Sequence, residues 1–91
     1  MELKKEKIIK VFKEVAFFNN ETHEKIVKND NFKFCDDWIM CKVDGVLYWI
    51  EIIPSIFYFN KLLEAKIQLT FNIRKNNRHG EIVYTFTRFY D

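Results

Sequence analysis

The sequence predicts an α+β fold in which one N-terminal amphipathic helix packs on a roughly five-stranded antiparallel sheet. Apolar residues recur at helical spacing through the first eighteen positions. From residue 31 onward they alternate with polar residues, or form runs rich in aromatic and β-branched side chains. A length of 91 residues, with 18% aromatic residues to fill a core, fits a single domain over residues 1–91.

The first predicted element is a helix over about residues 3–18. Its apolar half consists of Ile8, Ile9, Val11, Phe12, Val15, Ala16 and Phe18, and its charged half of Glu6, Lys7, Lys10, Lys13 and Glu14. We expect Phe12 and Val15 to pack against Ile67, Leu69 and Phe71 of the sheet. The following stretch, ETHEKIVKND, is compatible with a second short helix that has Asn20 as its N-cap.

The strand region begins near residue 31. Asp36-Asp37 predicts a turn between FKFC and WIMC, and Asp44-Gly45 predicts a two-residue hairpin between WIMCKV and VLYWIEII. Pro54 is expected to end that strand because proline lacks an amide donor. Residues 55–63 fit either a strand or a helical turn. EAKIQLTFNIR then alternates and pairs back through KNNRHG with EIVYTFTRFY, which allows a meander.

The inventory of catalytic residues argues against most enzyme classes. Ser55 is the only serine and lacks the flanking glycines of a nucleophile elbow. Cys35 and Cys41 stand in apolar strands, where we expect both to be buried. His23 is expected at the surface, and neither histidine has metal-ligand spacing to a cysteine. With two glycines there is no glycine-rich nucleotide loop, so we expect no metal and no small-molecule cofactor.

The composition indicates a cytoplasmic protein in a reducing environment. Two cysteines do not make a disulfide scaffold. Lys10, Lys13 and Glu14 interrupt the N-terminal apolar stretch before it could serve as a signal peptide. The longest apolar run, IFYF, is far shorter than a membrane span, so we expect no membrane association.

The central strand VLYWIEII is apolar on both faces, and the preceding strand repeats this pattern. A helix of about 16 residues is roughly 24 Å long and covers one face of a sheet. The second face then needs another cover: residues 54–63, a second copy in a homodimer, or a partner protein. The candidate partner-binding residues on that face are Trp38, Leu47, Trp49 and Ile53.

The stretch NIRKNNRHGE places four basic residues, Arg74, Lys75, Arg78 and His79, around turn-forming asparagines and a glycine. It is interpreted either as a solvated hairpin tip or as a phosphate-binding site. The phosphate interpretation predicts a nucleic-acid-binding protein, or a small metal-free ribonuclease. The residues that such a ribonuclease would use are Arg74, Arg78, His79, Arg88 and Tyr90.

The leading hypothesis is a small non-enzymatic protein-binding module, with a partner protein or a second copy on the apolar face. In size, composition and lack of catalytic residues, the chain looks like small proteins of phages and mobile elements that inhibit host machinery, anti-CRISPR proteins among them. This resemblance implies an inhibitory role for the module. Nucleic-acid binding through the basic hairpin is the alternative hypothesis.

Overall fold

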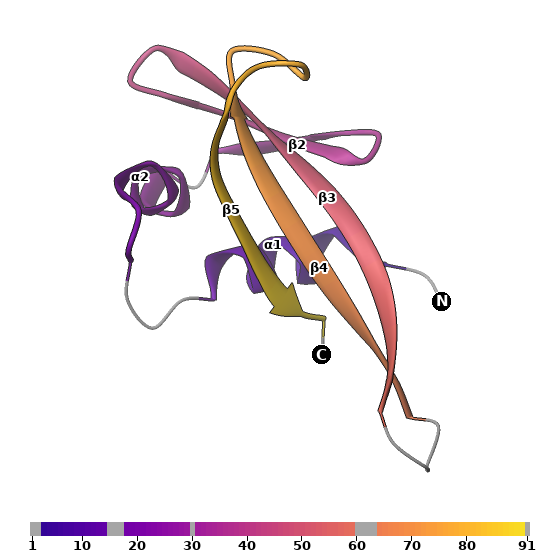
Figure 1. Ribbon diagram of the computed structural model, residues 1–91. Coiled ribbons are helices and arrows are strands. Elements are labelled where there is room, and N and C mark those ends of the chain that lie inside the picture. Colours follow the sequence, from indigo (N-terminus) through magenta and orange to yellow (C-terminus); the bar gives the residue numbers. More distant parts are fainter. Residues whose placement is uncertain (1–2, 15–17, 30, 60–63, 91) are drawn as a thin grey trace.

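The computed structural model describes residues 3–14, 18–29, 31–59 and 64–90, with the backbone alone at 57–59 and 64. Within them, two helices precede five strands. The elements are α1 (Lys5–Lys13), α2 (Glu21–Asn29), β1 (Phe32–Cys35), β2 (Trp38–Val43), β3 (Val46–Phe59), β4 (Glu64–Lys75) and β5 (Ile82–Phe89). The strands form one antiparallel meander in the order β1-β2-β3-β4-β5 (Figure 1). The predicted α+β fold is confirmed. Neither α1 nor α2 is long and apolar enough to cross a membrane.

Both helices pack on the same face of the sheet, around Phe12 of α1 (Figure 1). The Phe12 side chain is fully buried, and its ring centroid lies 5.4 Å from that of Phe71, 5.5 Å from Phe86 and 5.8 Å from Phe32. Ile26 brings α2 into the same cluster. The buried hydrophobic residues are Ile8, Val11, Phe12, Ile26, Ile39, Cys41, Val43, Ile50, Ile67, Leu69, Phe71, Ile73 and Phe86. The predicted packing of Phe12 on Ile67, Leu69 and Phe71 is confirmed, whereas Val15 lies outside the described residues.

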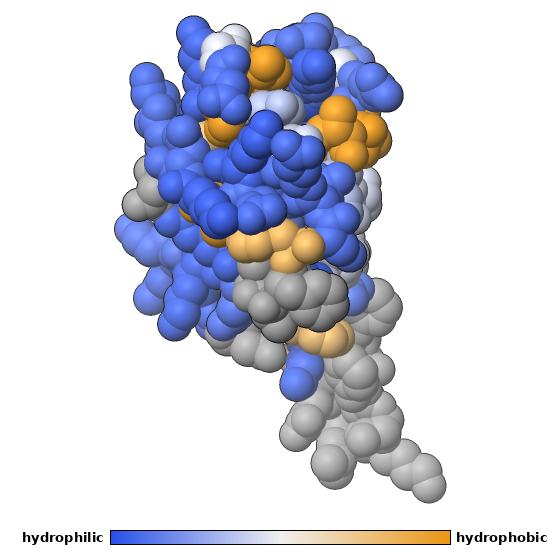
Figure 2. All heavy atoms as spheres, turned by 90° about the vertical axis from the view of Figure 1, so that its left-hand side faces the viewer, coloured by the Kyte–Doolittle hydropathy of each residue, from blue (hydrophilic) through white to orange (hydrophobic). Residues whose placement is uncertain are grey.

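The polar halves of the helices face solvent. The side of the molecule at the left of Figure 1, where α2 lies, is mostly hydrophilic, and apolar residues show there only in separate places (Figure 2). Lys25 and Lys28 of α2 form ion pairs one helical turn back, with Glu21 at 3.2 Å and Glu24 at 2.7 Å. These exposed pairs stabilise the helix only slightly, so its position depends on the apolar contacts.

The expected helix over 3–18 is too long. α1 begins at Lys5 and ends at Lys13, because Glu14 has an extended backbone (φ −78°, ψ 90°). The Glu14 amide donates to the Val11 carbonyl three residues back, which closes a tighter turn than that of an α-helix. Phe18 also lies outside the helix, whereas Val15 and Ala16 lie outside the described residues. The second helix is confirmed, with the Asn20 side chain accepting from the His23 amide at 3.0 Å as an N-cap.

Two tight turns follow the predicted pattern. Asp44 and Gly45 both have positive φ angles, 51° and 79°, as the two-residue hairpin between β2 and β3 requires. Asp36 also has a positive φ of 55°, in the turn that brings Cys35 opposite Trp38. Aspartate and glycine tolerate this left-handed region better than other residues, so the local sequence fixes both turns.

The expectation that Pro54 ends its strand is wrong: β3 continues through it to Phe59. β2 pairs with β3 only as far as Glu51. The Leu47 carbonyl accepts a hydrogen bond from the Asn76 amide on the β4 side of β3. The backbone polar groups of successive residues point to alternate sides of a strand, so the Pro54 nitrogen points to the side away from β4. None of the described strands lies on that side at this point, so proline there removes no ladder bond. Residues 55–59 are strand, and 60–63 lie outside the described residues.

Beyond this point β3 and β4 project from the sheet as a two-stranded arm (Figure 1). β5 pairs with β4 no further back than Gln68, so none of the other described strands flanks the arm. Its Ile56 side chain is 61% exposed. A two-stranded ribbon of this kind gains little from packing, so its stability depends on the sheet at its base.

His23 is buried, contrary to expectation, with 2% of its surface exposed. One helical turn separates it from Ile26, so α2 directs both residues toward the sheet. The His23 ring stacks on Phe86 at 4.3 Å, and its Nε2 lies 3.2 Å from the Phe12 carbonyl oxygen. That carbonyl stands at the end of α1, so His23 satisfies a helix-terminal acceptor and finds a partner for its own N–H.

The Phe12→Ala change should lower the free energy of unfolding by about 3–5 kcal/mol, because it removes the ring from the centre of the core. A urea titration followed by circular dichroism measures the loss. Ile56→Ala in the exposed arm is the control, with an expected loss of about 0.5 kcal/mol or less. A loss below about 1 kcal/mol for Phe12→Ala would show that α1 does not pack as described.

Stability should also depend on the protonation of His23. Burial lowers the pKa of His23 below its usual 6.5, and nearby Arg88 acts in the same direction, whereas the hydrogen bond that His23 donates to the Phe12 carbonyl opposes the shift. The unfolded chain therefore binds the proton first, so the free energy of unfolding falls as the pH drops below about 6.5. In urea titrations between about pH 7 and 5, the free energy of unfolding of His23→Phe should change less with pH than that of the wild type. Equal slopes in both proteins would contradict the buried position of His23.

Candidate functional site

The second face of the sheet carries the apolar residues that the sequence singled out. The side chains of Trp38, Leu47 and Trp49 point to the face of the sheet opposite to the core residues of β2 and β3. The alternation of the sequence predicted this placement. No element among the described residues packs over them. Each is partly buried by its neighbours, and Ile53, farther along β3, is 41% exposed. We call the surface formed by Trp38, Met40, Leu47 and Trp49 the tryptophan face.

Trp49 is held firmly at the centre of this surface. Its ring meets that of Trp38 edge to face, with centroids 6.1 Å apart. The Arg78 guanidinium lies 5.6 Å from the Trp49 ring centroid, within the range of a cation–π contact. The Trp49 Nε1 atom is shielded from solvent and has no acceptor among the described residues. The ring is therefore positioned while its one polar group lacks a partner, which is uncommon in folded proteins.

Two lysines that the sequence did not single out border the tryptophan face. Register places Lys33 of β1 opposite Met40, and Lys42 of β2 opposite Leu47. Both lysines are exposed. Together with Asn31, Met40, Cys41 and Leu47 they line a hollow of about 240 Å³. Only the pairing of three strands brings them together, so no local sequence pattern could have identified this hollow.

A polar network occupies the same face on β3, β4 and β5. Asn72 donates to Glu51 at 3.0 Å, and Thr85 donates to Asn72 at 2.8 Å. Arg74 forms an ion pair with Glu51 at 3.6 Å and donates to the Gly80 carbonyl at 3.0 Å. Arg74 thus joins the 76–81 turn to β3, although its buried Nε finds no acceptor among the described residues.

The basic hairpin is consequently not one cluster. Lys75, Arg78 and His79 are exposed, whereas the Arg74 side chain is 24% exposed and its charge faces Glu51. Arg78 is turned onto Trp49, so it belongs to the border of the tryptophan face. Two basic residues, Lys75 and His79, remain as the solvated tip.

The five residues of the ribonuclease hypothesis do not converge. Arg88 and Tyr90 lie at the end of β5 opposite the 76–81 turn. Arg88 donates to the Glu14 carbonyl at 3.4 Å and to the Thr87 carbonyl at 2.7 Å. The Tyr90 hydroxyl accepts from the Lys4 amide at 2.9 Å. Both residues are thus bound to the helix side of the sheet, away from Arg78 and His79.

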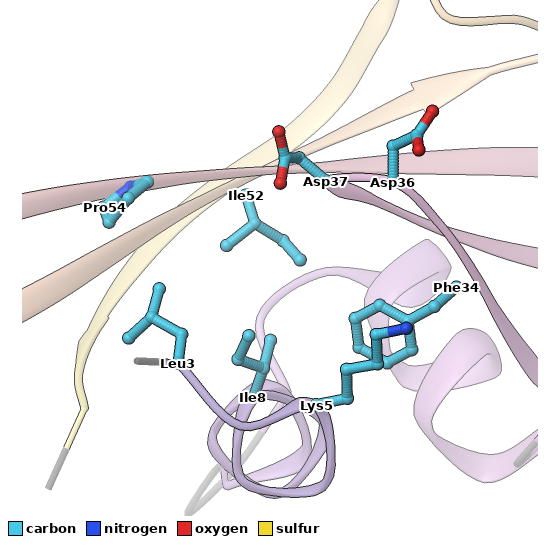
Figure 3. A pocket seen from close by; sticks show the side chains of 8 residues that line it. All are labelled: Leu3, Lys5, Ile8, Phe34, Asp36, Asp37, Ile52 and Pro54. Atoms are coloured by element: carbon cyan, nitrogen blue, oxygen red, sulfur yellow. The ribbon is translucent and has the colours of Figure 1, made fainter. Parts of the chain in front are cut away.

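A second hollow, of about 270 Å³, lies between the start of α1 and the sheet. Figure 3 shows Leu3 and Ile8 facing Ile52 across it, while the Asp36 carboxylate points away from them. Asp36 and Asp37 belong to the exposed turn after β1. Within the part of the chain that the structure describes, no three His, Cys, Asp or Glu side chains lie close enough to hold a metal ion.

The two cysteines differ, although both were expected to be buried. Cys41 is buried, and burial raises the pKa of its thiol against a hydrogen bond from the Asn31 backbone. Cys35 is exposed, because strand alternation turns it to the uncovered face at the end of the edge strand β1. They lie on opposite faces of the sheet and do not form a pair.

Comparison with known proteins assigns the chain to no family: no family model, no curated protein and no solved structure matches it. What the tryptophan face binds has therefore to be inferred from its own chemistry.

Proposed function

We propose that the protein is a small non-enzymatic protein-binding module whose tryptophan face docks on a partner protein. One observation carries this proposal: β2 and β3 are apolar on both faces, and the described helices cover only one. An apolar patch with a polar border is typical of protein interaction surfaces. Tryptophan, methionine and arginine, which make up and border this patch, are the residue types enriched in such surfaces.

Trp49 is suited to provide most of the binding energy. Trp38 and Arg78 already fix its ring, so little side-chain entropy remains to be lost on binding. Preorganised aromatic residues near the centre of a patch are the usual hot spots of protein interfaces.

A partner of different sequence fits this face better than a second copy. A two-fold contact presents the same patch from both subunits. Lys33, Lys42 and Arg78 of both copies would then border one shared interface, and an excess of like charge at an interface is unfavourable. A module of this kind could act as an inhibitor of host machinery by occupying a surface of its target, the role that its size and composition favour.

The Trp49→Glu change tests the proposal. The new carboxylate would lie beside Arg74 and Arg78, so the variant should fold, with an unchanged circular dichroism spectrum. Ile56→Glu is the matched control, an apolar-to-acidic change at an exposed site farther along the same strand. Each tagged protein is incubated with lysate of the source cell, and retained proteins are quantified by mass spectrometry.

We expect at least one protein to be retained by the wild type and by Ile56→Glu and to be lost with Trp49→Glu. Identical sets of retained proteins for all three versions would contradict docking through the tryptophan face. Unfolding of Trp49→Glu would instead indicate that the face is covered by the chain itself. A native mass of two chains, reduced to one in Trp49→Glu, would identify a second copy as the occupant.

A further inference from the structure

We infer that the partner presents an acidic segment to the tryptophan face, with one carboxylate side chain seated in the hollow between Lys33 and Lys42. This inference rests on the proposed function and specifies the chemistry of the partner. Three observations support it: the unbalanced positive charge around the face, the lining of the hollow, and the orientation of the tryptophan rings.

The border of the tryptophan face is positively charged and unpaired. Lys33, Lys42 and Arg78 form no ion pair among the described residues, whereas Lys25 and Lys28 on α2 each face a carboxylate. Glu51, the acidic residue that the described strands carry on this face, is already engaged by Arg74 and Asn72. The charge that remains available around the tryptophan face is therefore positive. A partner with negative charge would be electrostatically complementary to it.

The hollow fits an acidic side chain with an aliphatic stem. Met40 and Leu47 give it an apolar lining, and Lys33 and Lys42 border it from two neighbouring strands. A glutamate could lay its methylene groups on the apolar residues and direct its carboxylate to both ammonium groups. Charge-assisted hydrogen bonds of this kind are stronger than those between neutral groups.

A carboxylate is favoured over the phosphates of a nucleic acid. Binding of single-stranded nucleic acid uses aromatic rings whose faces are free to stack on bases. Here Arg78 lies over the Trp49 ring, and Trp38 meets it edge to face. Three cations also give a log–log salt slope of only about −2, which means weak binding to a single strand at physiological salt.

The inference is tested with a capped peptide of alternating glutamate and leucine, added to the full chain at low ionic strength. Binding is followed through the indole N–H signals in ¹H–¹⁵N spectra, assigned with Trp38→Phe. Lys33→Glu/Lys42→Glu is compared with Lys4→Glu/Lys10→Glu, which makes the same charge change at exposed positions on the helix side. Lys33→Gln/Lys42→Gln replaces the first variant if circular dichroism shows that its fold is lost.

We expect the Trp49 indole signal to shift on addition of the peptide, and the shift to weaken with salt. The dissociation constant should rise about tenfold in the Lys33/Lys42 variant and less than about twofold in the Lys4/Lys10 variant. An oligothymidylate of equal charge should bind more weakly than the peptide.

Three results would overturn the inference: no salt-sensitive shift with the peptide, equal affinities in both lysine variants, or tighter binding of the oligothymidylate. The proposed function has a separate readout. If a captured protein is lost with Trp49→Glu but kept with Lys33→Glu/Lys42→Glu, docking through the tryptophan face stands and the acidic partner does not. If Trp49→Glu loses no protein, the proposed function fails.

Discussion

The contact of Phe12 with the sheet is the interaction on which the rest of the structure depends. Its ring touches aromatic residues of β1, β4 and β5, and its carbonyl meets the buried His23 of α2. This one residue thus holds both helices to the same face of the sheet. Since neither helix can then reach the other face, the apolar residues there have no cover among the described elements.

The uncovered face is ordered by the strands beneath it. Lys33, Met40, Trp49 and Arg74 lie in one row across four strands, and Trp38, Glu51, Asn72 and Thr85 lie in the next. The rows place apolar and basic residues on β1 to β3, and a hydrogen-bonded polar network that runs from Glu51 of β3 across β4 to β5. A binding surface built on paired strands changes little when a partner docks, which lowers the entropic cost of association.

Local sequence signals predicted the elements whose causes are local. The Asp44-Gly45 hairpin, the alternation of β4 and the apolar stripe of α1 follow from turn chemistry and periodicity. The division of β3 into two apolar faces was predicted in the same way, and with it the position of Trp38 and Trp49.

Tertiary contacts decided what the sequence left unpredicted. α1 ends at Lys13 because Glu14 is extended, His23 is buried because α2 directs it to the Phe12 carbonyl, and Pro54 is tolerated because β2 stops short of it. Lys33 and Lys42 are nine residues apart in the sequence, and only the register of β1, β2 and β3 makes them neighbours of the tryptophan face. Arg74 likewise belongs to the Glu51 network rather than to a solvated tip.

The tryptophan face has no cover among the described elements, and its border is positively charged. Both tryptophans of the chain lie on this face, so the whole tryptophan fluorescence reports on it. Quenching by iodide and by caesium, compared at equal ionic strength, measures accessibility and local charge together. Each ion is referred to its quenching of free N-acetyltryptophanamide. On that scale both quenchers should reach the rings, with iodide the more effective because Lys33, Lys42 and Arg78 attract it. Fluorescence that neither ion quenches would show that the face is covered, and caesium quenching equal to that of iodide on the same scale would show that its border is not positive.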